Sequence, residues 1–268
     1  MLYALIVIII AGIGLLIYGW WDTNRFDVRR VKIELDRLPK AFDGFTILQV
    51  SDLHNRAYGR DGRDLERAIQ GLSFDCIAIT GDLLDRHRPG KRDNGYRFVK
   101  EAAKAGPTYF IQGNHEWQMD DWPAIKAELT RRGARVLDNE NITFVRDTVR
   151  LALIGSMEKA TTKEIQAIIE KDICSVLLAH HPERFSEYAQ MDVDLILSGH
   201  AHGGQVRLFG RGLYSPGQGV LPRYTSGVYR QGKTTLYVSR GAGNHSFLLP
   251  RIFDRPEIDL ITLKTPSC

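Results

Sequence analysis

Carboxylate, amide and imidazole side chains recur along the chain in short motifs of the forms DxH, GDxxD, GNHE and GHxH, and one further His ends an apolar run. The side chains in these positions that could bind metal ions are Asp52, His54, Asp82, Asn114, His180, His200 and His202. Taken singly, each has an ordinary structural explanation, because an Asp after a strand usually caps a helix and an Asn after Gly usually makes a turn. Chance coincidence of all five patterns in this order is improbable, so we interpret them as one site.

The chemistry of these side chains indicates two metal ions. Oxygen and imidazole ligands without thiolates suit Mn, Fe or Zn and disfavour a closed structural zinc site. One carboxylate able to bridge two ions, with three further ligands for each, is the composition of a two-metal hydrolase, which clamps a phosphoryl group and makes hydroxide available near neutral pH. The sequence therefore predicts two divalent metal ions per chain, with Mn favoured.

Each motif follows a short apolar run that is typical of a strand. The expected strands are residues 46–50, 76–79, 109–112, 176–179 and 195–197, and stretches compatible with helices lie between them at residues 61–70, 97–104, 122–132 and 162–171. Strands that alternate with helices of this length predict an α/β fold with crossover units and largely parallel strands. In such sheets the functional crevice lies beyond the carboxyl ends of the strands, where all the metal-binding candidates fall.

Together the motifs resemble the signature of the calcineurin-like metallophosphoesterases. They are Asp52-Leu53-His54, Gly81-Asp82-Leu83-Leu84-Asp85-Arg86, Gly113-Asn114-His115-Glu116, His180 and Gly199-His200-Ala201-His202. The resemblance covers about residue 46 to the C-terminus. It implies a four-layer αββα sandwich with a dinuclear site where the loops of the two sheets meet. It further implies that a metal-bound hydroxide attacks phosphorus in line. The implied ligand sets are Asp52, His54 and His202 for one metal and Asn114, His180 and His200 for the other, with Asp82 as the bridge.

The resemblance also implies roles for three residues that are not ligands. His115 resembles the family's histidine that protonates the leaving oxygen or stabilises the transition state. A carboxylate at Asp85, hydrogen-bonded to the second imidazole nitrogen, would fix the tautomer of His115 and raise its basicity. Arg86 resembles the arginine that contacts phosphoryl oxygens in the protein-phosphatase branch, and an ordinary surface arginine is the alternative.

Several residues near the motifs could also belong to the site. His180 and His181 are adjacent, so alternation along a strand directs only one of them inward, and His180 is preferred as the first His after the apolar run. Asn55 and His87 are expected to be loop residues, and His245, which follows a glycine-rich turn, is left out of the site. The three cysteines form no CxxC pair, and Cys76 and Cys174, beside apolar runs, are expected to be buried thiols.

An apolar segment precedes the motifs. From residue 2 to residue 18 every side chain is apolar, Gly or Tyr, and Trp20-Trp21 closes the run before Asp22 introduces the first charge. A helix of roughly 20 such residues spans a bilayer core, and paired tryptophans suit the headgroup boundary. A cleaved signal peptide is the competing interpretation, but its basic start, shorter apolar stretch and small-residue cleavage site are not visible. The sequence predicts a transmembrane anchor at residues 1–21 and one domain at residues 22–268.

Basic residues follow this segment at Arg25, Arg29, Arg30 and Lys32, and none precedes it. The positive-inside rule then predicts a single-pass protein of the cell membrane with its catalytic domain on the cytoplasmic side. The same charges can instead belong to the first strand of the domain. Sidedness is therefore a weaker inference than the anchor.

The expected function is hydrolysis of a phosphodiester or pyrophosphate bond in a membrane or lipid-linked substrate. The stretch from Gly203-Gly204-Gln205 to Arg255-Pro256-Glu257-Ile258 resembles a bacterial membrane-associated subfamily that includes enzymes cleaving UDP-2,3-diacylglucosamine. A phosphomonoesterase or protein phosphatase with the same metals is the alternative. The formal net charge of only +4, without basic runs interleaved with aromatics, disfavours a nuclease. A metal-binding scaffold without catalysis is disfavoured because it would need neither His115 nor Asp85.

Overall fold

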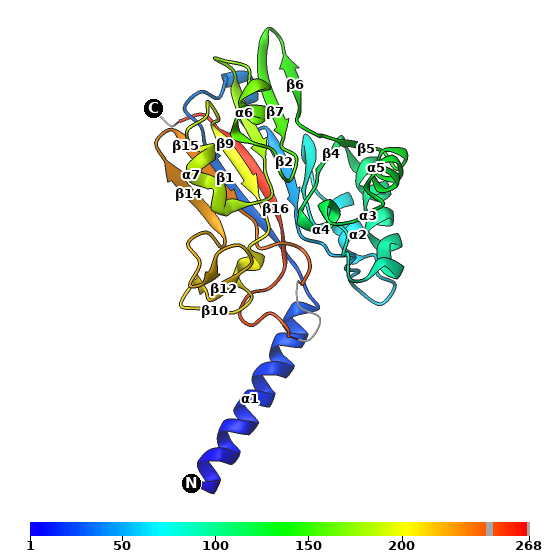
Figure 1. Cartoon of the computed structure of the whole chain (residues 1–268), viewed down its shortest axis with the longest axis vertical. Coiled ribbons are helices and arrows are strands. Elements are labelled where there is room, and N and C mark those ends of the chain that lie inside the picture. The colour runs from blue at the N-terminus through cyan, green and yellow to red at the C-terminus, as the bar shows by residue number, and fades with distance from the viewer. Residues whose placement is uncertain (245–248, 267–268) are drawn as a thin grey trace.

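The computed structural model describes residues 1–244 and 249–266, and it contains two six-stranded sheets (Figure 1). In the first sheet the strand order is β1 (Asp27–Glu34), β16 (Glu257–Lys264), β2 (Thr46–Val50), β3 (Cys76–Thr80), β4 (Thr108–Ile111) and β5 (Ala134–Val136). In the second it is β14 (Gly227–Gln231), β15 (Thr234–Val238), β9 (Leu195–Ser198), β8 (Cys174–Leu178), β7 (Val149–Gly155) and β6 (Glu140–Arg146). The α/β class expected from the alternating runs is confirmed.

Most neighbouring strands run parallel, as expected. The exceptions in the two large sheets are the pairs β16–β2, β14–β15 and β6–β7, which are antiparallel. The last of these pairs is joined by a short turn, and β16 enters the first sheet from the far end of the chain. All five strands that were expected to deliver site residues are present, namely β2, β3, β4, β8 and β9.

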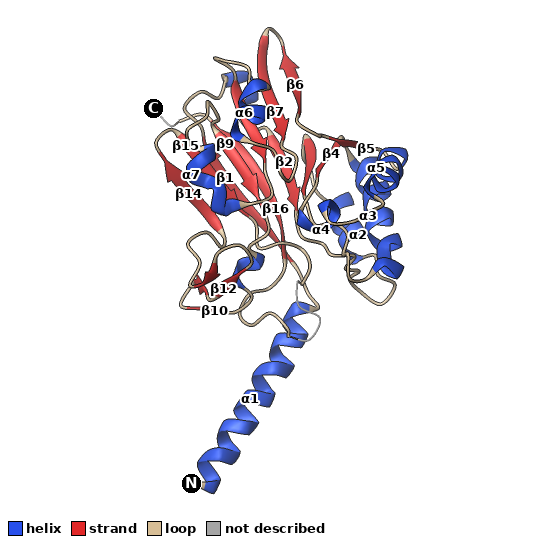
Figure 2. Ribbon diagram, in the orientation of Figure 1, coloured by secondary structure: helices blue, strands red, loops and turns tan. Residues whose placement is uncertain are grey.

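The two sheets pack face to face, with helices on the outer face of each (Figure 2). Alternation along the strands separates these layers: Ile47 of β2 lies in the core between the sheets, whereas its neighbour Leu48 packs toward the outer helices. The first sheet is covered by α2 (Asp64–Gln70), α3 (Arg92–Ala105) and α5 (Trp122–Arg131), and the second by α6 (Thr162–Ala167) and α7 (Phe185–Tyr188). Cys76 and Cys174 are buried free thiols in the core between the sheets, as expected.

Local signals explain where these helices begin and end. Pro123 occupies the first turn of α5, and Gly133 follows its end with a φ of +102°, a conformation that suits glycine. The α6 helix begins with a capping box in which Thr161 and Glu164 bond each other's backbone N–H groups. It ends at Ala167, four residues before the expected boundary at residue 171.

The N-terminal segment forms α1 (Leu2–Thr23), the one helix in the described part of the chain that is long and apolar enough to cross a membrane. It projects from the sandwich, and only Gly19, Asp22 and Thr23 are buried (Figure 1). Its last turn is fixed to the domain, because the backbone N–H of Arg251 donates to Thr23 Oγ1 at 2.8 Å and Arg255 Nε donates to Asp22 Oδ1 at 2.7 Å. The helix thus extends two residues beyond the expected end of the anchor at residue 21.

Three of the four basic residues that suggested a cytoplasmic domain, Arg29, Arg30 and Lys32, lie in β1. Because these residues are part of a strand of the domain, their positions do not by themselves indicate the side of the membrane. The sidedness of the domain stays a prediction.

Candidate functional site

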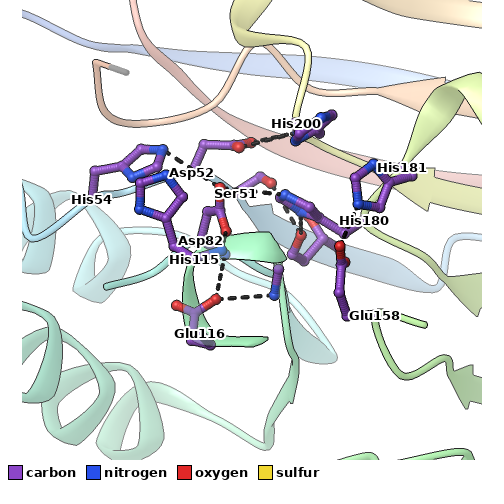
Figure 3. Close-up of polar contacts among 12 residues, drawn as sticks. Ser51, Asp52, His54, Asp82, His115, Glu116, Glu158, His180, His181 and His200 are labelled. Carbon is purple, nitrogen blue, oxygen red and sulfur yellow. Dashed lines mark hydrogen bonds and ion pairs between the residues drawn. The ribbon is translucent and has the colours of Figure 1, made fainter. Parts of the chain in front are cut away.

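The predicted site residues come from the carboxyl ends of strands in both sheets. Asp52 and His54 follow β2, Asp82 follows β3, and His180 and His200 follow β8 and β9. Asn114 begins the short helix α4 (Asn114–Trp117) after β4, and His202 begins a 3-10 turn, His202–Gly204. Figure 3 shows Asp52 and Asp82 between His54 and His115 on one side and His180 and His200 on the other. The loops of the two sheets thus converge on one place.

Four groups of possible metal ligands result among the described residues, and two of them consist of predicted ligands alone. The ligand atoms of Asp52, His54 and His202 lie within 4.8 Å of one another, and so do those of Asp82, His180 and His200. Asp82 connects the groups, because its Oδ2 lies 3.4 Å from His180 Nε2 and 3.8 Å from His54 Nε2. Together these two groups contain six of the seven ligands that the resemblance implied, all except Asn114.

Two polar atoms in the site are placed as a metal would need them. The carbonyl oxygen of Thr80 lies 2.7 Å from His180 Nδ1, which therefore holds the ring proton and leaves a lone pair on Nε2. His180 Nε2 is buried and faces Asp82 Oδ2 at 3.4 Å without a hydrogen bond of good geometry, and Asn114 Oδ1 is buried with no hydrogen-bond partner among the described residues. Buried polar atoms in native proteins are normally satisfied, so the donor set fits metal ions at this place.

The charges of the site point the same way. The pKa of the Asp52 carboxyl is raised to about 6, mainly because the group is buried; His180 opposes the shift and the neighbouring Asp82 adds to it. Two carboxylates buried together are unfavourable unless a cation accompanies them. A divalent ion at each group would supply that charge.

The backbone at these strand ends is strained. Five of the seven candidate ligands adopt left-handed conformations, with φ of 46–64°, at Asp52, His54, Asp82, His200 and His202. Such conformations are uncommon outside glycine, cost roughly 1–3 kcal/mol each and cluster at functional sites. Gly199 permits the close packing, since a Cβ at this position would lie 1.8 Å from Ser51 Oγ and 2.3 Å from Asp52 Oδ2. The backbone N–H of His200 donates to both oxygens of Asp52 at 3.0 Å.

Glu116 supports the site, although no role was predicted for it. Its carboxylate is fully buried and accepts three backbone N–H groups, from Asp82 at 3.0 Å, Gly113 at 2.9 Å and Leu84 at 2.8 Å. Burial and the neighbouring Asp82 together raise the pKa of Glu116 to about 7. This carboxylate joins the loop after β3 to the loop after β4. A Glu three residues after the helix-starting Gly113 is a capping-box pattern that could have indicated it.

The structure places Asp85 beside His115. Asp85 Oδ1 lies 3.4 Å from His115 Nδ1, which is longer than a usual hydrogen bond. The backbone N–H of Arg86 donates to the same nitrogen at 3.3 Å, a bond that exists only while Nδ1 carries no proton. Burial lowers the pKa of His115, but Asp85 and Asp82 more than offset this and the pKa is raised. The protonated ring is thereby favoured, as an acid requires. The Arg86 guanidinium is on the exposed rim, in contact with Gln118 and His87.

The remaining histidines and Asn55 differ in their positions relative to the site. His180 faces Asp82, whereas His181 contacts Glu158 through Nε2 at 2.6 Å and Glu183 through Nδ1 at 2.8 Å. His87 is an exposed loop residue, as expected. Asn55 also follows β2 in a loop, but it is buried, and its side chain donates to the backbone oxygen of Arg88 at 3.3 Å. His245 lies outside the described residues.

Arg251 is a second residue that contacts the site and was not predicted from the sequence. Its side chain is completely buried, and Nη2 lies 3.1 Å from His202 Nδ1, while Nη1 donates to the backbone oxygen of Arg240 at 2.7 Å. Because arginine only donates, neutral His202 in this contact carries its proton on Nε2. Metal binding through Nε2 requires release of that proton or a shift of the Arg251 contact. No local sequence signal marks Arg251, since its partner lies 49 residues away.

Comparisons with known proteins identify the family of the chain. The family model described as calcineurin-like phosphoesterase matches residues 45–204. Metallophosphoesterase YkuE of Bacillus subtilis is 28% identical over 273 residues, covering 96% of this chain and 92% of the relative. A Bos taurus protein named "transmembrane protein with metallophosphoesterase domain" is 28% identical over 259 residues, covering 88% of this chain and 57% of its own length. Among solved structures, the sulfate thiohydrolase SoxB of Thermus thermophilus aligns with a TM-score of 0.50 and 14% identity, over 85% of this chain and 57% of that one, which is a likeness of fold alone.

Proposed function

Because the chain belongs to the calcineurin-like phosphoesterase family and is a metal-dependent phosphoester hydrolase, we propose that it cleaves phosphodiester or pyrophosphate bonds of a membrane or lipid-linked substrate. The observation that carries the dinuclear part of the proposal is the position of Asp82 between two groups of ligand atoms. Asp52, His54 and His202 would hold one ion, Asn114, His180 and His200 the other, and Asp82 would bridge them. Bound divalent ions would supply a nucleophile from water near neutral pH and stabilise charge on the phosphoryl group.

The residues around the metals would handle the proton and the substrate. His115 would donate a proton to the leaving oxygen, and its raised pKa supports that role. Asp85, whose Oδ1 faces His115 Nδ1, would hold the ring in position for that transfer. Arg86 on the rim would contact the phosphoryl oxygens after leaving its contacts with Gln118 and His87.

A membrane location is supported by α1, which is apolar and exposed except at its last turn. The Bos taurus relative is named as a transmembrane protein, which supports the same proposal. Anchoring raises the effective concentration of substrates held in the same membrane. A lipid-linked phosphoester such as UDP-2,3-diacylglucosamine is therefore the proposed substrate type, and the cytoplasmic side is the proposed side.

The test is a direct comparison of monoester and diester substrates with the full chain in detergent and Mn²⁺ as the added ion. The panel contains an aryl phosphomonoester, an aryl phosphodiester, UDP-2,3-diacylglucosamine and phospholipids, with Asp82→Asn as the inactive control. Preference for diester or pyrophosphate substrates is expected. Preference for the monoester would replace the proposal with the alternative, a phosphomonoesterase or protein phosphatase using the same residues.

A further inference from the structure

The base of α1 lies near the candidate metal site. A continuous set of contacts joins them: Thr23 bonds the backbone of Arg251, and the Arg251 side chain reaches His202. On the other side, Arg56, two residues after His54, donates to the backbone oxygen of Thr23 at 3.3 Å. The base of α1 therefore lies close to the candidate metal site, with the buried Arg251 between them.

Two small hairpins lie near the base of α1, β10 (Arg207–Leu208) with β11 (Arg211–Gly212), and β12 (Tyr214–Ser215) with β13 (Gly219–Val220). Figure 1 shows β10 and β12 beside the exit of α1, whereas β6 extends at the opposite end. These hairpins and the adjoining segment expose five large apolar side chains, which we call the apolar loop surface: Leu208, Phe209, Val220, Leu221 and Phe253. Phe209 is fully exposed, and Val220 and Leu221 are 77% and 71% exposed.

The apolar loop surface is continuous with α1. The ring centroids of Phe253 and Tyr18 are 5.3 Å apart, so the surface meets the helix near its exit from the domain. The segment that carries Phe253 also pairs with the first hairpin, since the backbone N–H of Arg207 donates to the oxygen of Ile252 at 3.0 Å. Phe253 thus lies against the helix, and Leu208 and Phe209 belong to the hairpin that pairs with its segment.

Backbone conformation adds a second argument. Phe209, Leu221 and Phe253 have φ of 49°, 54° and 55°, a left-handed region in which bulky residues are outliers. Residues held there persist when their surroundings repay the strain. The backbone N–H of Leu221 donates to the oxygen of Leu213 at 2.9 Å, so the hairpin itself holds part of this conformation. The side chains of Phe209 and Leu221 stay exposed, which fits a surface that an external apolar phase covers.

The arginines next to the apolar loop surface fit a lipid headgroup boundary. Arg207, Arg211 and Arg223 line a cavity of about 330 Å³ next to Leu221, and Arg211 and Arg223 are exposed. Arginines beside apolar tips fit an anionic headgroup layer over acyl chains, and each basic residue near such a surface adds to membrane attraction. Contact with a second copy of the chain would not require arginines beside these exposed apolar side chains.

The hairpins also border the metal site. A Cβ at Gly217, between β12 and β13, would lie 2.3 Å from Glu183 Oε1 and 3.3 Å from His200 Nε2. The same short element therefore contacts a candidate ligand and carries the exposed Val220.

We propose that the apolar loop surface inserts into the headgroup boundary of the bilayer next to α1, so that the metal site opens directly onto membrane lipid. The inference rests on the proposed membrane anchoring and adds a second contact to it. It specifies the substrate class as an amphiphile whose phosphoester sits at the headgroup level, reached without leaving the membrane.

The test uses the full chain reconstituted in vesicles of phosphatidylcholine with phosphatidylglycerol. An environment-sensitive fluorophore is attached to Cys in Phe209→Cys, in a Cys268→Ser background in which the native thiols Cys76 and Cys174 are buried. The matched control is Val145→Cys, because Val145 is also an exposed apolar residue, 62% exposed, but lies in β6. The label at residue 209 should shift to the blue and be quenched by lipids with a nitroxide on the acyl chain, and the label at residue 145 should not.

An activity measurement complements the fluorescence. The double variant Phe209→Asn/Leu221→Asn should fold well, because Asn tolerates a positive φ. It should cleave a soluble aryl phosphodiester at the wild-type rate but an acylated phosphodiester in vesicles about tenfold more slowly, the effect of partly removing two apolar side chains from lipid. The control Val145→Asn should change neither rate.

Equal accessibility of the labels at residues 209 and 145 would overturn the inference. So would a blue shift at residue 209 that depends on protein density instead of the lipid quencher, since a second copy would then occupy the surface. The proposed hydrolase function fails separately, if the wild-type protein with Mn²⁺ does not cleave the soluble diester.

Discussion

Glu116 offers a sharp test of how the site is held together. Its buried carboxylate accepts two backbone N–H groups on Oε2, from Asp82 and Gly113, and one on Oε1, from Leu84. In Glu116→Gln the amide oxygen can replace Oε2 and keep two of these bonds. The amide NH₂ must then face the N–H of Leu84, so that two donors meet without an acceptor.

The loss of stability in Glu116→Gln follows from these changes in hydrogen bonding. A buried donor left without a partner costs about 1–3 kcal/mol, and the two remaining bonds weaken because they lose a charged acceptor. Relief from burying a charge offsets part of this loss. We expect a net destabilisation of about 2–3 kcal/mol at pH 8, where the wild-type carboxyl, with a pKa of about 7, is mainly ionised. For a domain of this size that corresponds to a decrease in Tm of roughly 5–10 °C.

The assay is thermal unfolding of the full chain in detergent, followed by intrinsic fluorescence. The matched control is Glu170→Gln, because Glu170 pairs with the exposed Arg150 at the surface, where an ion pair contributes below about 1 kcal/mol. A decrease in Tm of less than about 1 °C for Glu116→Gln, or one equal to that of Glu170→Gln, would refute the reasoning about buried N–H groups.

Three further variants test the other roles. His115→Ala should lower kcat by roughly 10²–10⁴-fold while metal content is retained, and loss of both metals would show that His115 is a ligand instead. Asp85→Asn should lower kcat by about 10–100-fold, less than His115→Ala, because it removes the partner of the ring and not the ring itself; an effect as large as that of His115→Ala would contradict a positioning role. Deletion of residues 1–18 keeps the buried last turn of α1, so the protein should remain active on a soluble aryl phosphodiester and leave membranes without detergent; a continued need for detergent would contradict the anchor.

The sequence predicted those parts of the structure that depend on neighbours along the chain. The apolar runs that end at Asp52, Asp82 and His200 became β2, β3 and β9, because a run of buried β-forming residues followed by a polar turn is a local signal. The position of β16 between β1 and β2 was not predicted, because that pairing joins opposite ends of the chain.

The supporting contacts of the site were predicted less well. Arg251 reaches His202 across the fold, and Glu116 acts on backbone groups of a loop 32–34 residues away, so neither contact leaves a periodic pattern in the sequence. The left-handed conformations of Asp52 and Asp82 likewise could not be predicted, because Asp tolerates this region but does not require it, so tertiary packing decides where it occurs. Binding residues could thus be named from their types, whereas the residues that orient them required the three-dimensional arrangement.

The central claim is that two divalent ions are held by the converging strand ends, with Asp82 between them. It is tested most directly by measuring metal content and activity on the same sample of purified full-length protein, before and after strong chelation and after Mn²⁺ is restored. We predict about two equivalents of metal per chain, loss of activity when they are removed, and recovery that requires both. Full activity in the metal-free protein would contradict the account.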